Sequence, residues 1–419
     1  MFARLALNAQ IGWFLALRAI RHASRWTTGL IIFVMALTFL NLVVVSGILV
    51  GLIQESVEAH RRQYTSDIIL SSHNDKTYIE NSPSVIAIVR GLPETESATP
   101  RYRAGGMLEA NYKTRTQGEK ANTAQAQIIG IDPHAEDAVT EISKSVVEGA
   151  YLLPGDYDQI LIGSFLLRQY VPVDNPGLAT LDNVEPGTRI RLDIQGVRRE
   201  VIVKGILKSK VQDISRNAYM VDGQLRTMIG RGDGNVAEIA VKLKSDADPL
   251  AVRAALVRLG VDHVAKVQTY ADAQPQFLKD IVSMFSTLGN VLGSIGLVVA
   301  SITIFIVVFI NAITRRKFIG ILKGIGINGA AIELSYIFQS IGYALAGSAI
   351  GLALLYGLLV PMLKAHPIDF PFSDGILVAP VGETLVRVIL LIAATVLAGY
   401  APARMIVRKN TLDSILGRN

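Results

Sequence analysis

The stretch Ala312-Ile-Thr-Arg-Arg-Lys-Phe-Ile-Gly-Ile-Leu-Lys-Gly-Ile-Gly-Ile327 is a short basic segment that lies between two long apolar runs. The run before it, residues 288–313, and the run after it, residues 337–363, contain no charged residue. Each is longer than the roughly 20 residues that an α-helix needs to cross the ~30 Å hydrocarbon core of a bilayer. The sequence therefore predicts two membrane helices that are joined by a positively charged loop.

The composition indicates a chain that is only partly embedded in a membrane. Hydrophobic residues make up 50% of its 419 residues, charged residues make up 18%, and the mean hydropathy is +0.39. We expect a membrane α-helical protein with four transmembrane helices and a large α+β domain outside the membrane. In chain order, the expected segments are an N-terminal amphipathic helix (1–28), a first span (29–53), an external domain with stalk helices (54–285), a second span (286–313), a coupling loop (314–336), a third span (337–363), an external loop (364–384), a fourth span (385–401) and a tail (402–419).

Basic residues set the expected orientation, because positively charged segments next to spans are retained in the cytoplasm. They gather before the first span, between the second and third, and after the fourth: Arg18, Arg21, Arg25, Arg315, Arg316, Lys317, Lys323, Arg404, Arg408 and Lys409. Both termini are therefore expected inside and residues 54–285 outside. This asymmetry also accounts for the formal charge of +6, so the charge is no argument for nucleic-acid binding.

The external block shows the alternation of short strands and helices that is typical of an α+β domain. Strands are predicted at 127–131, 189–194, 200–207 and 238–243, and helices at 83–90, 163–170 and 249–259. No helix breaker follows Ile53. We therefore expect the first helix to continue out of the membrane as a stalk, to about residue 64.

Small residues recur at four-residue intervals in the second and third spans, as Gly289 with Gly293 and Gly347 with Gly351. This spacing lets helices approach closely, within a chain or across a dimer. Glycine is also common in membrane helices without such a role. Glu383 and Arg387, near the outer end of the fourth span, are expected to snorkel or to form a simple pair rather than to be functional.

Sequence motifs for catalysis and for cofactor binding are missing from this chain. The sequence contains no G-x-x-x-x-G-K-[ST], no H-E-x-x-H and no G-x-S-x-G, and it has no cysteine. Its six histidines are scattered without the spacing of zinc ligands. We expect a non-catalytic chain with no metal and no cofactor of its own, which transmits mechanical work.

The basic loop resembles a known signature. Residues 317–326, K-F-I-G-I-L-K-G-I-G, are similar to the R-E-I-G-I-L-K-A-I-G motif of FtsX-like permeases, in the ABC superfamily group that includes MacB and the LolC and LolE subunits. Further similarities to this MacB-like family are L-A-L-R-A-I-R-H at 15–22, I-D-P at 131–133, V-E-G-A-Y-L at 147–152, I-L-I-G at 160–163 and A-P-A-R at 401–404.

The resemblance implies a bacterial inner-membrane permease with a periplasmic MacB-like core domain and a cytoplasmic coupling helix that docks on a separate ABC ATPase, where ATP and Mg²⁺ are bound. Apart from Lys317, which stands in place of arginine, two positions depart from the motif. Phe318 replaces the usual glutamate and Gly324 replaces alanine, so an apolar insertion would take the place of an ionic contact. The implied ATPase-coupling residues are Arg315, Arg316, Lys317, Phe318, Ile319, Gly320, Ile321, Leu322, Lys323, Gly324, Ile325 and Gly326.

The leading hypothesis is an ATP-driven mechanotransmission permease that works as a dimer with a second copy or a paralogue. Its cargo would be a lipoprotein, a lipid or another amphiphile, held in a groove lined by Val282, Met284, Phe285 and Leu288. Packing between stalk helices explains these four residues equally well. The alternative is an FtsX-like signalling subunit that activates a periplasmic protein partner and moves no cargo.

Overall fold

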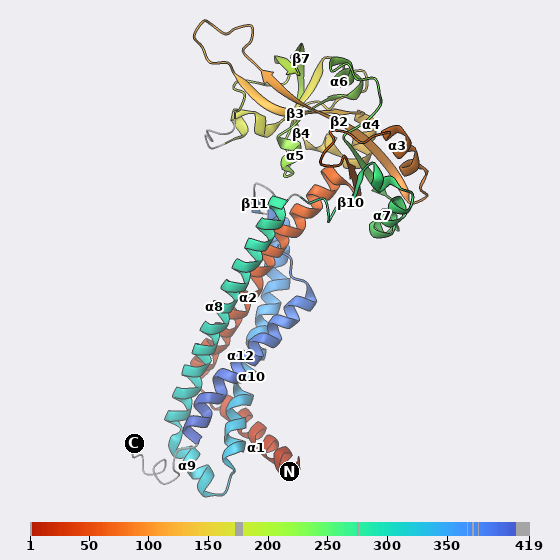
Figure 1. The fold of residues 1–419 in the computed structure, drawn as a ribbon. Helices are drawn as coiled ribbons and strands as arrows, with labels where there is room; N and C mark the ends of the chain where they lie inside the picture. Colours follow the sequence, from red (N-terminus) through yellow and green to blue (C-terminus); the bar gives the residue numbers. More distant parts are fainter. Residues whose placement is uncertain are drawn as a thin grey trace. The chain divides into compact units, whose positions relative to one another are not determined.

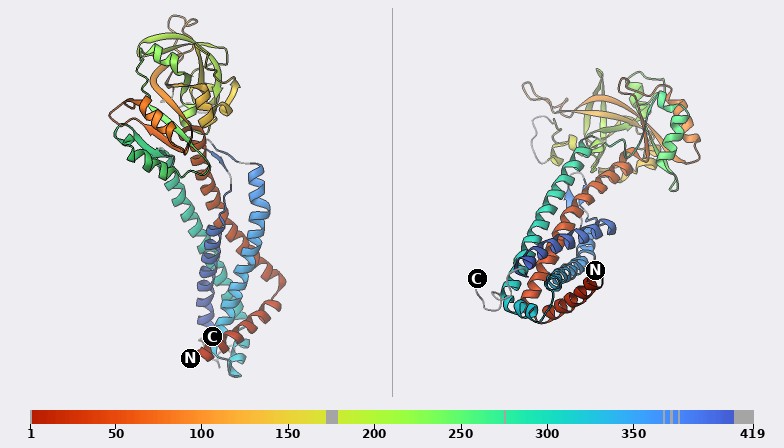
Figure 2. Two further views of the ribbon diagram at one scale, coloured as in Figure 1. Left: turned by 90° about the vertical axis from the view of Figure 1, so that its right-hand side faces the viewer. Right: turned by 60° about the horizontal axis from the view of Figure 1, so that its bottom comes forward.

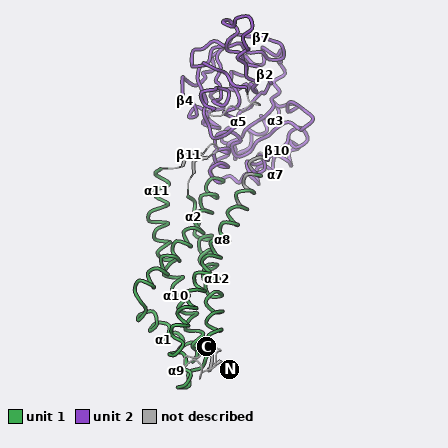
Figure 3. The backbone as a smooth tube through the Cα atoms, turned by 90° about the vertical axis from the view of Figure 1, so that its left-hand side faces the viewer, with its two compact units in different colours: residues 1–53, 280–369, 374–419 green, residues 54–279, 370–373 purple. Residues whose placement is uncertain are grey.

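The computed structural model describes residues 2–171, 179–274, 276–366, 368–370, 373–375 and 377–407. The chain separates into two compact units, which are coloured in Figure 3. The first contains residues 1–53, 280–369 and 374–419, and the second contains residues 54–279 and 370–373. Pro275, where we expected the second stalk to begin, and the basic tail residues Arg408 and Lys409 lie outside the described residues.

The first unit is a bundle of long apolar helices. Four helical segments are long and apolar enough to cross a membrane, which confirms the predicted number within the described chain. Its elements are α1 (Phe2–Arg21), α2 (Arg25–His60), α8 (Gln276–Thr314), α9 (Arg316–Gly324), α10 (Gly329–Leu354), a π-helical turn (Leu355–Leu359), α11 (Val360–Ala365), the short strands β11 (Ile368–Phe370) and β12 (Ser373–Gly375), and α12 (Val381–Val407).

Helix packing in the first unit follows the small residues. α2 and α8 run side by side (Figures 1 and 2), and Gly293 of α8 faces Leu42 of α2. α10 packs against both α1 and α12. The buried core takes side chains such as Phe39, Ile304 and Leu391 from three of these helices. Because the opposite face of α8 exposes a row of apolar side chains from Val291 to Ile310, this face suits contact with lipid.

The second unit is a mixed α+β domain, as expected. It contains β1 (Ile68–Ser71), α3 (Ser82–Gly91), β2 (Thr95–Glu109), β3 (Thr123–Ile131), α4 (Pro133–Thr140), β4 (Val146–Gly149), β5 (Gln159–Gly163), β6 (Arg189–Ile194), β7 (Val197–Leu207), α5 (Gln212–Ser215), β8 (Ala218–Val221), α6 (Asp222–Met228), β9 (Glu238–Leu243), α7 (Pro249–Arg258) and β10 (Lys266–Thr269). The strand order is β10-β1-β9-β2-β3-β8-β5-β7-β4, and β6 pairs with both β2 and β7.

The long strand β2 joins two lobes of this domain. Its first half pairs with β9 and its second half pairs with β3 and β6. One hydrophobic core lies under α3 and α7 in the first lobe, and a larger one fills the second lobe. A third cluster packs Ala59, at the end of α2, and Tyr64, just beyond it, against Ile129 and Leu161 of the sheet. The end of the first long helix is therefore part of the core of the second unit.

The prediction of a helix at 163–170 is wrong. Strand β5 ends at Gly163, and two single 3₁₀ turns follow, Ser164–Leu166 and Arg168–Tyr170, separated by Leu167 in an extended conformation. A Cβ at Gly163 would lie 2.3 Å from the carbonyl oxygen of Ser215. The apolar residues of this segment are buried in the turns that follow the strand, such as Leu166 and Leu167.

Candidate functional site

The predicted coupling segment folds as a short helix, α9, at the end of the long helix α8. Arg315 lies at the N-terminal boundary of α9, and its carbonyl accepts a hydrogen bond from the Ile319 amide at 3.0 Å. Arg316 and Lys317 occupy the first turn. Cations are unfavourable at a helix N-terminus, so these charges are not placed there for the stability of the helix.

α9 has two distinct faces. Ile319 is 3% exposed and packs with Ala403 and Ile406 of α12. Phe318 and Ile321, on the other side, are 54% and 53% exposed. Because residues three and four apart share a helix face, Ile321 and the exposed Ile325 continue the side that Phe318 begins. The helix therefore presents an apolar face to its surroundings while its opposite face is held by the bundle.

The end of α9 is fixed by a glycine turn. Gly326 has φ +93°, and its amide donates to the Lys323 carbonyl while the Ile327 amide donates to the Leu322 carbonyl, both at 3.0 Å. This is the Schellman arrangement, in which glycine at the left-handed position closes a helix. The Asn328 side chain then accepts from the Ala330 amide at 3.0 Å and starts α10. The sequence thus defines both ends of the coupling helix without a flexible linker.

The C-terminal end of α12 braces the coupling helix. The Lys323 ammonium donates to the carbonyl of Val407, and a Cβ on Gly329 would lie 3.2 Å from the Val407 side chain. Arg404 donates to the Tyr400 hydroxyl at 2.7 Å. The A-P-A-R segment, predicted only as a closing motif, therefore belongs to the structure that holds α9.

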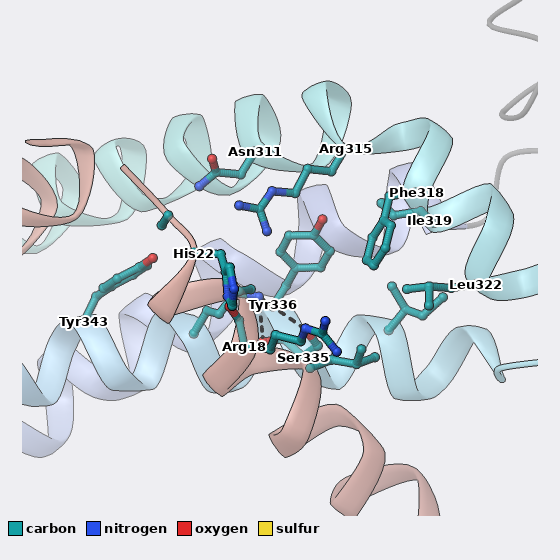
Figure 4. Close-up of a pocket in the computed structure, with 15 residues that line it drawn as sticks. Arg18, His22, Asn311, Arg315, Phe318, Ile319, Leu322, Ser335, Tyr336 and Tyr343 are labelled. Atoms are coloured by element: carbon teal, nitrogen blue, oxygen red, sulfur yellow. Dashed lines mark hydrogen bonds between the residues drawn. The ribbon is translucent and has the colours of Figure 1, made fainter. Parts of the chain in front are cut away.

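A cavity of about 170 Å³ lies between α1, the α8–α9 junction and α10 (Figure 4). Arg315 reaches into it from the junction, and Arg18 of α1 and His22, just beyond the end of α1, lie on the facing side. Tyr336, on α10, is 6% exposed. The residues lining it are Leu15, Arg18, Ala19, His22, Ala23, Asn311, Arg315, Phe318, Ile319, Leu322, Ile332, Ser335, Tyr336, Gln339 and Tyr343.

The glycines proposed for helix packing contact neighbouring helices of the same chain. A Cβ on Gly347 would lie 2.4 Å from the Met35 Cβ, and one on Gly351 would lie 2.3 Å from the Phe39 ring. Gly289 faces Leu49 at 3.1 Å in the same way. The structure therefore places this close approach between α10 and α2 and between α8 and α2.

Only two of the four residues that were proposed to contact cargo are exposed on one face of α8 within the described residues. Met284 and Leu288 lie one turn apart on α8 and are 54% and 46% exposed. Phe285 is half-buried. The side chain of Val282 lies outside the described residues. Glu383 and Arg387 form the expected pair, at 3.4 Å.

The sequence did not predict a buried network of charged side chains in the second unit. Arg101 and Glu136 are each 1% exposed, and Arg101 donates to the Glu136 carboxylate through Nε at 3.0 Å and Nη2 at 2.6 Å. The same Nη2 also donates to the Tyr64 carbonyl at 2.8 Å, and the Tyr64 hydroxyl donates to Glu238 at 3.1 Å. Since Tyr64 belongs to the π-helical segment Arg61–Thr65 that ends the first long helix, the network fastens this helix end to the sheet.

A second charge contact lies beside this helix end. His60 is 4% exposed, and its Nε2 lies 3.5 Å from the Asp213 carboxylate. Burial alone would raise the pKa of Asp213, but His60, helped by Arg103 and Arg101, holds this pKa below its ordinary value. Burial and the nearby Glu238 raise the pKa of Tyr64 well above its usual range. The local sequence around His60 and Asp213 could not have shown this contact, because the two residues are distant in the chain.

No cluster of three histidine, aspartate or glutamate side chains suited to hold a metal is found among the described residues.

Comparisons with known proteins identify both units. Residues 28–259, more than half of the chain, match the MacB-like periplasmic core domain, and residues 290–411 match the FtsX-like permease C-terminal region. The macrolide export ATP-binding/permease protein MacB of Agrobacterium fabrum is 24% identical over 244 residues, which are 52% of this chain and 35% of that protein. The chain thus spans about a third of the length of this relative.

Two solved structures are also similar to part of the chain. The periplasmic region of MacB from Actinobacillus actinomycetemcomitans is 17% identical, with a TM-score of 0.36 over 52% of this chain and 95% of that one. The extracellular domain of the noncanonic ABC-type transporter YknZ from Gram-positive bacteria is 13% identical, with a TM-score of 0.32 over 48% and 98%. With the two family matches, the four long apolar helices and the mixed-sheet domain, the chain belongs to the FtsX-like, MacB-like permease family of ABC transporters.

Proposed function

We propose that this chain is the permease subunit of a mechanotransmission complex, in which a separate cytoplasmic ABC ATPase docks on α9. The observation that supports this most strongly is the exposed apolar face of Phe318, Ile321 and Ile325 on a helix whose other face is anchored. Exposed apolar patches mark interaction surfaces, and a short amphipathic helix fits a groove on a partner. Phe318 supplies an apolar anchor where the family motif has a carboxylate.

The topology in this proposal follows the basic residues. Arg315, Arg316 and Lys317 place α9 in the cytoplasm, so both termini lie inside and the mixed-sheet unit lies in the periplasm of a bacterial inner-membrane protein. ATP and Mg²⁺ would be bound by the ATPase.

The long helices support force transmission. α2 has 36 residues and α8 has 39, whereas roughly 20 suffice to cross a bilayer. At 1.5 Å per residue α2 is about 54 Å long, so it has length to spare beyond the membrane. Because Ala59 and Tyr64 pack in the core of the second unit, movement of this helix end would displace the core rather than a loose loop.

The cargo in this proposal is a lipoprotein, a lipid or another amphiphile. The uncharged second and third spans suit an amphiphile that leaves from the outer leaflet better than a polar solute that needs a channel. Met284 and Leu288, exposed on one face of α8, provide apolar surface for it. A second copy or a paralogue would complete a dimer. Native mass spectrometry that finds a captured protein and no amphiphile would favour the signalling alternative instead.

ATPase coupling in proteoliposomes that contain the complex tests this proposal. Ile321→Asp adds a charge to the exposed face of α9 without touching the core, whereas Leu322 is partly buried against it. Losing an apolar contact of about 1.5–3 kcal/mol and burying an unpaired charge should reduce coupling by more than about tenfold. Met405→Asp, at a 58% exposed position on α12, is the matched control. Equal coupling in the two variants would refute docking through α9.

A further inference from the structure

The cavity beside the coupling helix combines positive charge with apolar side chains. Its charged and titratable lining consists of Arg18, His22 and Arg315, together with the hydroxyls of Tyr336 and Tyr343, and no acidic side chain lines it. Among the described residues, neither Arg18 nor Arg315 has an acidic partner in an ion pair. Glu333, the acidic residue on the same stretch of α10, is not part of the lining. The cavity is therefore cationic and uncompensated within the described chain.

Guanidinium groups in this arrangement suit a phosphate. Arginine binds phosphate oxygens through two parallel N–H donors, and Arg18 and Arg315 come from two different helices that face one another across the cavity (Figure 4). A tyrosine hydroxyl can add a third donor. A water needs roughly 10–15 Å³ of such space, so about 170 Å³ has room for a phosphate with atoms attached to it.

The rest of the lining favours a lipid over a soluble phosphate. Leu15, Ala19, Phe318, Ile319, Leu322 and Ile332 give the lining an apolar part in addition to the charged groups. Arg315 follows directly after α8, whose uncharged part ends at Thr314, so the charge lies where a membrane span meets the headgroup region. Basic pockets between helices at this depth bind anionic headgroups.

We propose that this cavity binds the headgroup phosphate of an anionic phospholipid, with the start of its acyl chains along the apolar part of the lining. The bound lipid would bridge α1 to the α8–α9 junction, which makes the position of the coupling helix sensitive to lipid charge. This proposal does not require the proposed function, since lipid binding can be measured without an ATPase.

The test uses the full chain in nanodiscs with equal amounts of phosphatidylglycerol and phosphatidylcholine, followed by native mass spectrometry. We expect the unmodified protein to retain phosphatidylglycerol about tenfold more than phosphatidylcholine, and Arg18→Gln with Arg315→Gln to remove this preference. Arg21→Gln, which changes an exposed arginine of α1 outside the cavity, should keep it. The single variant Arg18→Gln, at an exposed side chain, should weaken the preference without disturbing the fold.

Three results would overturn the proposal. The first is equal retention of both lipids by the unmodified protein, and the second is an unchanged preference in the double variant or in a folded Arg18→Gln variant. The third is displacement of the lipid by inorganic phosphate at the same concentration, which would assign the site to a soluble phosphate. None of these results would bear on whether an ATPase docks on α9, so the two proposals fail independently.

Discussion

Replacing Glu136 by glutamine should loosen the attachment between the end of the first long helix and the mixed sheet of the second unit. Glu136 is 1% exposed, and its carboxylate accepts from Arg101 at 2.6 and 3.0 Å, from Thr99 at 3.1 Å and from Thr140 at 3.0 Å. Glutamine keeps the shape but removes the closer counter-charge of the buried Arg101 guanidinium, whose other carboxylate, that of Glu238, lies 3.8 Å away. Removing one partner of a buried ion pair costs about 3–5 kcal/mol. Because every 1.4 kcal/mol is a factor of ten, local opening should become more frequent by a factor of roughly 10² to 10⁴.

Hydrogen–deuterium exchange of the full chain, read by mass spectrometry, measures this opening directly. Amides of the π-helical segment Arg61–Thr65 should exchange faster in Glu136→Gln, because Arg101 also holds the carbonyl of Tyr64. Glu141→Gln is the matched control, since Glu141 pairs with Lys144 on the surface at 2.6 Å. Exposed pairs contribute about 0–1 kcal/mol, so the control should change exchange by less than about tenfold. Equal exchange in the two variants would refute the assignment of the buried pair as an anchor.

Two further predictions concern helix packing and pH. Gly351→Ala should lower the free energy of unfolding by about 1–3 kcal/mol, because the new Cβ would lie 2.3 Å from the buried ring of Phe39. Thermal unfolding in detergent measures this change. Gly357→Ala, where the space is open, is the control and should unfold at a higher temperature than Gly351→Ala. The pKa of Asp213 is lowered beside His60. The ionised carboxylate of Asp213 therefore contributes its full stabilisation above the ordinary aspartate pKa of about 3.9, and this stabilisation is lost as the pH falls through the lowered pKa. Hydrogen exchange near this contact should accelerate below about pH 4, and Asp213→Asn should remove that dependence on pH. The same dependence of exchange on pH in the variant would contradict this prediction.

Much of the fold was predictable because local patterns agreed with the environment of each segment. The strands expected at 189–194 and 238–243 coincide with β6 and β9, where β-branched residues alternate with polar ones. The continuation of the first helix beyond Ile53 is also confirmed, since α2 ends at His60 and a π-helical segment follows. The fourth apolar helix extends beyond the expected 385–401 to Val381–Val407, because its ends pack on the bundle rather than in lipid alone.

The strand β2 shows where pattern reasoning failed. It contains Pro100, Gly105 and Gly106 and a buried Arg101, which are poor signals for a strand. It is nevertheless a 15-residue strand, because it supplies pairing edges to two lobes and its charges find partners that are distant in the sequence. Such tertiary partners cannot be read from one segment.

The sequence located the candidate coupling segment but could not show which of its side chains face outward. The basic loop and its motif located α9, yet which residues face outward depends on the contact of Ile319 with α12 and on the glycine turn at Gly326. The cavity that contains Arg18 and Arg315 was not foreseen at all, since it forms only when helices from both ends of the chain meet.

The central claim is that Ile321, on the exposed face of α9, lies in the cytoplasm where an ATPase covers it. The chain has no cysteine, so Ile321→Cys creates a single labelling site, and Lys120→Cys, at an exposed position of the mixed-sheet unit, provides the opposite reference. A membrane-impermeant maleimide should label Ile321→Cys only in inverted vesicles, with protection when the ATPase is bound, and Lys120→Cys only from the external side. Labelling of Ile321→Cys from the external side, or no protection by the ATPase, would contradict the account.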